Sequence, residues 1–481
     1  MNFKQKNSKI SVIVFAFVLI FMAPACNDTL EFSPQSELTP GTFLTTESGM
    51  RSLLVSAYNG IQWTSFGGAN KMYTSVWMGE NMWETGGGLN RSAVLFLDYT
   101  YDSSMGWFNG FWNTSFAAIR DANTVLDNID DNKELSDDES QQIIAEARFV
   151  RATAYFFLYN WFGPPPLVTS STPENLEPKR ASEEEIKTFI EDEYSAIYNQ
   201  LPENDESGRA TKGAALGMLT KHFLNTKQWQ KAADAAKDIM DMNRYELYPD
   251  YFELFQIENE NNNEFIFVHP AVNIAGEGNV LPPAYFPPGF PTPASHENWA
   301  AQVRLRDNFV NTFEEGDERL ELIVTEFTDV DGNHVQLLGD DNSRSFKYWP
   351  DPDPNGRWTG NDIPEIRYSD ILLSRAEALN ELNGPNQESI DLINMVRERA
   401  DVSLLQLSDF GSKEELRSHI LDERGWEFVH EAKRKQDMRR HGVLISNAQS
   451  RGINAEPKHR LFPIPQAEMD ANPNLEQNPG F

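Results

Sequence analysis

Aromatic side chains in two irregular stretches are the residues of this chain best suited to bind a ligand. The first stretch, Gln62 to Gly110, is rich in glycine and aromatic residues and contains the triplet Gly86-Gly87-Gly88. The second includes the proline-rich run Leu281 to Pro293, which cannot form a regular helix or a central strand. Aromatic rings in irregular backbone commonly line binding sites. For any single ring, however, packing in the core is the commoner role.

No residue pattern in the sequence marks a catalytic or metal site. His296-Glu297 and His430-Glu431 resemble half of a zinc-protease motif, but Ala300 and Arg434 stand where that motif needs its second histidine. The run Asp329 to Asn333 lacks the full spacing of a calcium loop and is more typical of a hairpin turn. Carboxylates are abundant, yet nothing in the sequence selects two of them as a glycosidase pair. We therefore predict no enzyme activity, no cofactor and no metal site.

The chain begins with the features of a bacterial lipoprotein signal. Three lysines precede the apolar run Ile10 to Met22, which is too short to span a bilayer. Small residues then lead to Cys26, the only cysteine, so no intramolecular disulfide is possible. We predict that residues 1–25 are removed and that Cys26 carries the lipid that anchors the protein to a membrane. The alternative is an ordinary signal peptide, because Ala23 stands where lipoprotein signals usually carry leucine.

The composition fits a large body with an acidic surface. The 481 residues carry a formal net charge of −32, and 40% of them are hydrophobic. Such a charge repels phosphate backbones, so we expect no nucleic acid partner. After the signal, no apolar run approaches the ~20 residues that a membrane helix needs. Residues 26–41 are polar and contain two prolines, which is typical of a flexible lead between the lipid and the body.

Helices dominate the elements that must position the aromatic stretches. Ser136 with Glu139 and Ser182 with Glu185 have capping-box spacing. Apolar spacing and stop signals predict helices at 45–61, 112–129, 136–161, 182–201, 212–224, 228–242, 366–382, 387–400 and 412–434. They make four helix pairs, mainly within 112–247 and 366–445. The pairs suggest tetratricopeptide-like units, although no strict consensus repeats and simple helical hairpins stay possible.

Charged residues on these helices are expected to have structural roles. Arg151 and Arg424 lie on or beside apolar stripes, where an arginine usually bridges helices through carboxylates. Glu427 and His430 share a face of the helix predicted at 412–434, and without companion ligands we interpret them as a surface pair.

The segment of about 248–364 differs from the helical parts and is predicted to be an irregular insertion. Glu264 to Val268 is a strand-like apolar run, and Leu322 to Thr328 reads as a strand that leads into the turn at Asp329 to Asn333. The proline-rich run between them either exposes Tyr285, Phe286 and Phe290 or buries them beneath itself.

Several runs, taken together and in order, resemble the SusD/RagB family of Bacteroidetes outer-membrane lipoproteins. After the lipid cysteine they are Ser33–Ser36, Ala145–Phe156 leading to Trp161–Gly163, Gly208–Lys212, Ile366–Leu373, Ala376–Asn380, Glu423-Arg424, Asp437–Gly442, Leu461–Pro465 and Gln477–Phe481. The resemblance extends from Cys26 to Phe481. It implies a mainly α, SusD-like fold at 42–481, with four tetratricopeptide-like helix pairs and an irregular ligand-binding half.

The same resemblance implies a role in nutrient capture. Members of the family are expected to bind oligosaccharides at the outer membrane, facing the cell exterior, and to pass them to a SusC-like TonB-dependent transporter. A sugar has an apolar face that stacks on aromatic rings and a rim of hydroxyls that needs short polar side chains. In this family the early loop and the insertion meet at the site. The candidate glycan-binding residues are Trp77, Asn81, Trp83, Asn90, Tyr99, Tyr101, Tyr285, Phe286, Trp299, Trp349 and Trp358.

Three alternatives stay open at this point. A peptide-binding member of the same family would use the same type of transporter, and the acidic surface does not disfavour it. A helical-repeat scaffold of the envelope would bind no small molecule. A glycosidase would have to turn over the sugar that it binds.

Overall fold

The structure, a computed structural model, describes residues 43–481 except 65, 85, 300 and 301. The predicted signal, Cys26 and the lead at 26–41 lie outside these residues. Residues 44–481 form one contact-dense unit in which helices predominate and strands are short, as the sequence predicts. No helix in the described part is both long and apolar enough to cross a membrane.

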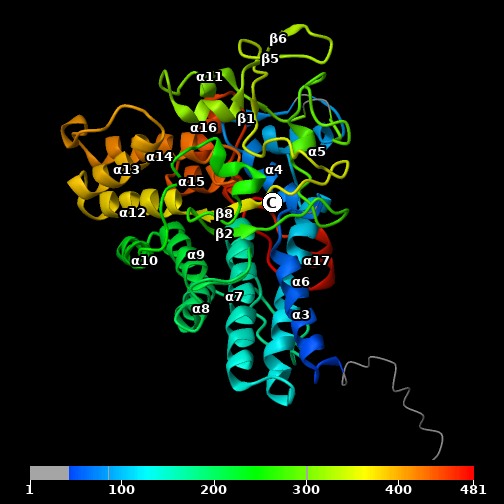
Figure 1. Cartoon of the computed structure of the whole chain (residues 1–481). Helices are drawn as coiled ribbons and strands as arrows, with labels where there is room; N and C mark the ends of the chain where they lie inside the picture. Colours follow the sequence, from blue (N-terminus) through cyan, green and yellow to red (C-terminus); the bar gives the residue numbers. More distant parts are fainter. Residues whose placement is uncertain (1–42, 65, 85, 300–301) are drawn as a thin grey trace, which may run out of the picture. The chain divides into compact units, whose positions relative to one another are not determined.

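Three long helices from the first third of the chain pack side by side (Figure 1): α3 (Glu47–Ile61), α6 (Gly106–Asn128) and α7 (Asp137–Phe162). Ser136 and Glu139 form the predicted capping box of α7, and α7 ends at Gly163, whose φ of 75° suits glycine. A second capping box, of Ser182 and Glu185, begins α8 (Glu183–Ile197), which packs against α7. The cap signals therefore set these helix starts correctly.

Helices from both sides of the insertion pack together. The central contact joins α10 (Trp229–Asp241) to α12 (Tyr368–Asn383). Around it, α9 (Lys212–Asn225) packs on α10, while α13 (Gln387–Arg399) and α14 (Lys413–Glu427) pack on α12. Shorter helices complete this half of the chain: α15 (Arg434–Arg440), α16 (Leu444–Ser450) and α17 (Gln466–Ala471). The chain thus returns after the insertion to continue the same helical layer.

Two helices occupy the stretch that we predicted to be loop between Gln62 and Gly110. They are α4 (Phe66–Trp77) and α5 (Asn90–Leu97), and α6 also starts earlier than predicted, at Gly106. The buried residues of α4 have helical spacing that the surrounding glycines and aromatics obscured: Ala69, Met72, Tyr73, Val76 and Trp77.

The helix predicted at 412–434 is interrupted. Helix α14 ends at Glu427, and α15 begins only at Arg434. Between them His430 and Ala432 adopt φ values of 65° and 59°, which a helix does not allow. Glu427 and His430 are both buried, so their interpretation as a surface pair is wrong. Both residues have partners inside the protein: the ring of Tyr285 packs on His430, and Arg367 and Arg399 bind Glu427.

The insertion is built from short antiparallel strand pairs. β2 (Phe265–His269) pairs with β8 (Ile363–Arg367), which joins the two ends of the insertion and leads directly into α12. β5 (Glu326–Thr328) and β6 (His334–Gln336) form the predicted hairpin, whose turn is held by Asp329. The remaining short elements are β1 (Met82–Trp83), β3 (Arg304–Leu305), β4 (Ile323–Val324), β7 (Arg344–Ser345) and α11 (Asp307–Val310).

The last residues of the chain are tied to the end of α7. The side-chain amide of Asn478 donates hydrogen bonds to the carbonyls of Phe162 (2.9 Å) and Phe462 (2.7 Å). Arg180 donates to the carbonyls of Phe162 and Glu476 and to the side chain of Asn478. The segment 477–481, which is part of the family resemblance, therefore connects distant parts of the chain.

Candidate functional site

The early stretch and the insertion meet through the pair β1–β3. Met82 lies opposite Leu305, and Trp83 lies opposite Arg304. The amide of Arg306 donates to the carbonyl of Asn81 at 2.9 Å, which extends the contact by one step. The indole Nε1 of Trp83 donates to the carbonyl of Asp341 at 2.7 Å, so a third segment joins the site. Segments more than 200 residues apart thus form one surface.

A second link clamps the glycine triplet against the insertion. The side-chain oxygen of Gln302 accepts from the amide of Leu89 at 2.8 Å, and its amide nitrogen donates to the carbonyl of Trp299 at 3.1 Å. Gly87 has a φ of 76°, and a Cβ there would lie 2.7 Å from the Cδ of Gln302. Only glycine fits this close approach without displacing Gln302. The triplet is therefore shaped by its contact with the insertion.

Trp299 forms a half-buried group with two charged residues. Its Nε1 donates to Glu297 at 3.0 Å, and Glu297 pairs with Arg357 at 3.2 Å. The guanidinium of Arg357 lies 5.7 Å from the centre of the Trp299 ring, within the range of a cation–π contact. This group offers an aromatic ring beside hydrogen-bonding groups, which is the combination that a sugar requires.

Two further tryptophans of the insertion are half-buried. Trp358 follows Arg357, and its Cβ lies 2.8 Å from the position that a Cβ at Gly278 would occupy, so backbone packs closely on one side. Trp349 packs edge-on against Phe252, with ring centres 4.8 Å apart. Asn90, at the first position of α5, is also partly exposed.

Six of the predicted glycan-binding residues are buried, and the structure corrects their assignment. Trp77, at the end of α4, is 0% exposed and stacks with Tyr73 and with Trp107. Tyr285 and Phe286 lie beneath the proline-rich run, against His430 and His296. Asn81, Tyr99 and Tyr101 are at most 5% exposed. None of the five rings presents a face to a ligand. The predicted residues that stay accessible are Trp83, Asn90, Trp299, Trp349 and Trp358.

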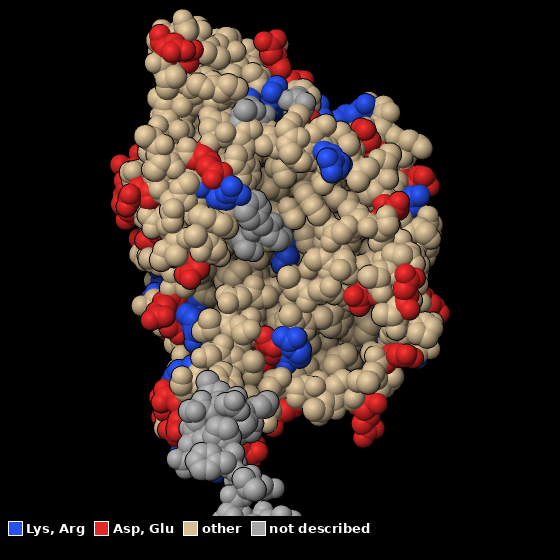
Figure 2. All heavy atoms as spheres, turned by 90° about the vertical axis from the view of Figure 1, so that its right-hand side faces the viewer, with Lys and Arg blue, Asp and Glu red and all other residues tan. Residues whose placement is uncertain are grey.

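Sequence reasoning missed several charged and polar residues of this surface. Glu297, Gln302 and Arg357 lie in loops, where no motif marks them as residues of a glycan site. Arg304 and Arg306 could have been noticed, because residues two apart in an extended segment lie on one face. On the face in Figure 2, acidic side chains lie mainly towards the margins, and several Lys and Arg side chains lie in the upper part.

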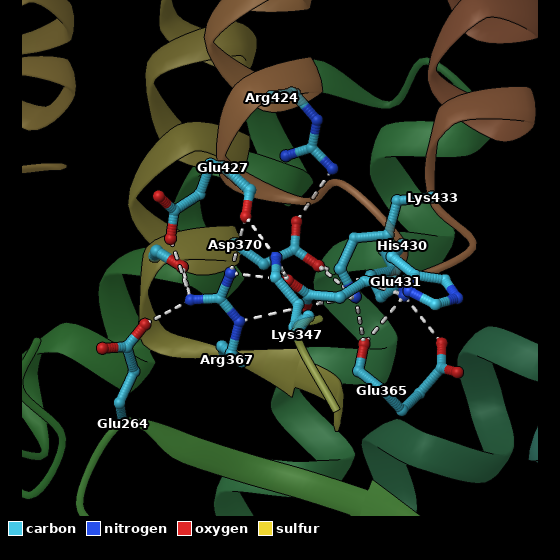
Figure 3. A network of polar contacts seen from close by, with 12 residues as sticks. Glu264, Lys347, Glu365, Arg367, Asp370, Arg424, Glu427, His430, Glu431 and Lys433 are labelled. Carbon is cyan, nitrogen blue, oxygen red and sulfur yellow. Dashed lines mark hydrogen bonds and ion pairs between the residues drawn. The ribbon is translucent and has the colours of Figure 1, made fainter. Parts of the chain in front are cut away.

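A network of buried charges lies between α12, α14 and the insertion (Figure 3). Arg367 binds Glu427 at 2.8 Å and Glu431 at 2.8 Å, and it also contacts Glu264. Lys347 binds Glu431 at 2.7 Å. Burial lowers the pKa of Lys347 to about 8, against the opposing effect of Glu431. The network joins residues from both ends of the insertion to the helical layer.

Both arginines that we predicted to bridge helices do so, Arg424 at the edge of this network and Arg151 elsewhere, between α7 and α8. Arg424 of α14 binds Asp370 of α12 and Asp437 of α15, each at 2.9 Å. Arg151 of α7 binds Glu193 of α8 at 2.7 Å. Both predictions of a bridge through carboxylates are confirmed.

The network also keeps Glu365 ionised. Burial alone would raise the pKa of Glu365, but its cationic neighbours, Lys221 first among them, lower that pKa to about 2.

The hollows of the molecule differ in character from the aromatic surface. A cavity of about 50 Å³ borders the network, lined by aromatic residues as well as by Lys221, Asp370 and Lys433, and it has room for a few waters rather than an oligosaccharide. A groove of about 630 Å³ lies between residues 203–211, Arg244-Tyr245 and 261–268. Its lining is mainly polar and includes three acidic residues and four asparagines. Within the described residues, no group of three or more His, Cys, Asp or Glu side chains could hold a metal ion.

Two family models match the chain. The model described as "SusD family" matches residues 344–481, and the model described as "Starch-binding associating with outer membrane" matches residues 28–224. A SusD-like protein P25 of Formosa agariphila is 28% identical, with 97% of each chain covered. The starch-binding protein SusD of Bacteroides thetaiotaomicron is 22% identical over 73% of this chain and 75% of that protein.

Solved structures with the same fold agree with these matches. A laminarin-binding SusD-like protein has a TM-score of 0.79 at 22% identity, and the match covers 91% of this chain and all of that one. The surface glycan-binding protein A of Bacteroides thetaiotaomicron in complex with laminarihexaose has a TM-score of 0.77 at 19% identity, covering 90% of this chain and all of that one. The expected mainly α, SusD-like fold is confirmed.

Proposed function

Because this chain belongs to the SusD/RagB family, we propose that it is a surface glycan-binding lipoprotein that captures oligosaccharides without cleaving them. The proposal includes a lipid on Cys26, attachment to the outer membrane with the body facing the exterior, and delivery of the ligand to a SusC-like TonB-dependent transporter. Relatives described as binding starch, laminarin and laminarihexaose support a carbohydrate ligand.

One observation carries the proposal for the site: Trp299, Glu297 and Arg357 form a half-exposed aromatic and polar group beside the junction of the early stretch with the insertion. We propose that Trp299 and Trp358 stack on sugar rings and that Trp83, Asn90 and Trp349 complete the site. Half-buried rings suit this role because their packing holds them in place while one part stays accessible.

Isothermal titration with a broad panel of oligosaccharides and a peptide mixture tests the proposal. We expect binding to at least one oligosaccharide, and we expect Trp299→Ala or Trp358→Ala to weaken it at least about tenfold, which corresponds to about 1.4 kcal/mol. Trp229→Ala is the matched control, because Trp229 is half-buried in the helical half. Binding of peptides alone would favour the peptide-binding alternative, and turnover of the bound sugar would contradict a non-catalytic role.

A further inference from the structure

Two arginines lie over the indole ring of Trp83. The guanidinium carbons of Arg304 and Arg306 are 5.8 and 5.6 Å from the ring centre, within the range of cation–π contacts. Both residues belong to the extended segment that pairs with β1, and both are partly exposed. The ring of Trp83 therefore contacts two positively charged side chains where the early stretch meets the insertion.

Two more arginines add to this charge. Repulsion from Arg304 acts on Arg344, and repulsion from Arg451 acts on Arg306, so each of the two added arginines is coupled to one of the arginines over Trp83. Arg344 is fully buried, and Arg451 follows the end of α16. We call these four residues the arginine cluster. Figure 1 labels β1, whose Trp83 lies opposite Arg304, and α11 and α16, which adjoin Arg306 and Arg451 in the sequence.

Three members of the arginine cluster, Arg306, Arg344 and Arg451, are poorly neutralised compared with Arg367 and Arg424. Arg306, Arg344 and Arg451 make no ion pair with any carboxylate of the described residues. One nitrogen of each, Nε of Arg306, Nε of Arg344 and Nη2 of Arg451, is buried without a hydrogen-bond partner there. Arg367 and Arg424, by contrast, each bind at least two carboxylates. A buried guanidinium without a carboxylate is unfavourable, so the cluster is a site that an anion would stabilise.

The nearby carboxylates are engaged elsewhere or weakly charged. Glu80 pairs with Arg434, and burial raises the pKa of Glu84 to about 7. Asp341 accepts a hydrogen bond from the backbone amide of Asp307, and Asp307 accepts from the amides of Gly339 and Asp341. Burial, followed by the repulsion from Arg304, lowers the pKa of Arg344 to about 9. The pKa of Arg306 is also lowered, by burial and then by Arg451, against a smaller opposing effect of Asp341.

We propose that the ligand of this site is an acidic oligosaccharide, whose carboxylate or sulfate groups bind Arg304 and Arg306 while Arg344 and Arg451 reinforce the positive potential. This inference rests on the proposed glycan-binding function and names its ligand class. Guanidinium groups bind carboxylates and sulfate-like oxyanions in paired hydrogen bonds. The net charge of −32 repels anions from most of the surface, so a local positive cluster is what an acidic ligand would need.

The first experiment uses small anions, so it does not depend on the sugar. Thermal unfolding is followed in sodium sulfate, sodium acetate and sodium chloride at equal ionic strength, for the wild type and Arg306→Gln. The backbone contacts of Arg306 are kept in this variant. We expect the midpoint to rise more in sulfate or acetate than in chloride, and part of this rise to be lost in Arg306→Gln. Arg120→Gln, which alters an exposed arginine on α6, should respond like the wild type. Equal responses of all three proteins would overturn the anion site.

The second experiment uses acidic glycans in affinity gel electrophoresis. Homogalacturonan and its methyl ester compare a carboxylate with its neutral form, and a carrageenan and its desulfated form do the same for sulfate. We expect stronger retention by an acidic member than by its neutral partner, and at least about tenfold weaker retention of Arg306→Gln. Equal binding to neutral and acidic forms would overturn this inference and leave the proposed function standing. An anion response without retention by any glycan, neutral ones included, would instead overturn the proposed function and the ligand class that rests on it.

Discussion

Arg367 binds Glu431 side-on: its Nη2 lies 2.8 Å from one carboxylate oxygen and its Nε lies 3.0 Å from the other. Both residues are buried, at the junction of β8 with α12 and in the bend between α14 and α15. Planar pairing of this kind fixes direction as well as distance. The pair therefore orients two segments that are 64 residues apart.

Arg367→Ala should destabilise the fold by about 3–5 kcal/mol, because Glu264, Glu427 and Glu431 would lose a shared partner inside the protein. Unfolding in urea, followed by circular dichroism, measures the change. Arg120→Gln serves as the surface control and should change the free energy of unfolding by less than about 0.5 kcal/mol. A cost of Arg367→Ala as small as that of the control would contradict the structural role of the network.

Glu260→Gln should stabilise the protein more at pH 8 than at pH 5. Burial and the neighbouring Asp362 raise the pKa of Glu260 to about 9 in the folded protein. A carboxyl group with a raised pKa stabilises the fold below its unfolded pKa, and this contribution is lost as the pH rises towards 9. Glutamine resembles the protonated acid and keeps an oxygen to accept from the amide of Asp362. Urea unfolding of both proteins at the two pH values tests this, and a gain independent of pH would contradict the raised pKa.

Gly87→Ala should destabilise the protein by at least about 1 kcal/mol, because a Cβ would strain a backbone with φ of 76° and collide with Gln302. It should also weaken ligand binding if the triplet borders the site. The neighbouring glycine provides a close control, since a Cβ at Gly86 meets no atom within 4 Å. Similar effects of Gly87→Ala and Gly86→Ala on urea unfolding would show that the contact with Gln302 is unimportant.

Cys26→Ala should abolish incorporation of labelled palmitate in cells, because the predicted lipid is attached through this sulfur. The purified body should bind its ligand unchanged, while uptake of that ligand should fall if tethering keeps the protein near its transporter. Because Cys26 is the only cysteine in the sequence, no other thiol could carry the lipid. Residual labelling would therefore contradict lipidation at Cys26. Unchanged uptake would contradict the role of the tether.

The helices could be predicted because their signals are local. Capping boxes at Ser136 and Ser182 and the stop at Gly163 fix helix ends within a few residues. Helix α4 was missed because its glycines and aromatics resemble loop composition, although its buried residues keep helical spacing. The bend after Glu427 was missed because positive φ at His430 and Ala432 is imposed by tertiary contacts.

The aromatic part of the site could be predicted only by location. The sequence shows that aromatic residues are concentrated in two stretches, but it does not show which of them are buried. Trp77 and Tyr285 entered the core, whereas Trp299 stayed at the surface with Glu297 and Arg357. The arginine cluster depends on pairing between residues over 200 positions apart, and no short motif encodes that. Long-range packing therefore decides the chemistry of the site.

Both ends of the irregular segment 265–346 are fastened to the helical body by charge, through Glu264 at one end and Lys347 at the other. The loops that link the short strands of this segment can change in length at little energetic cost, since doubling the length of a flexible loop costs only about 0.6 kcal/mol in closure entropy. Insertions and deletions between these anchors would then alter ligand preference while the helices keep their arrangement. The buried charges thus keep the helical arrangement constant while changes in the segment alter ligand specificity during evolution.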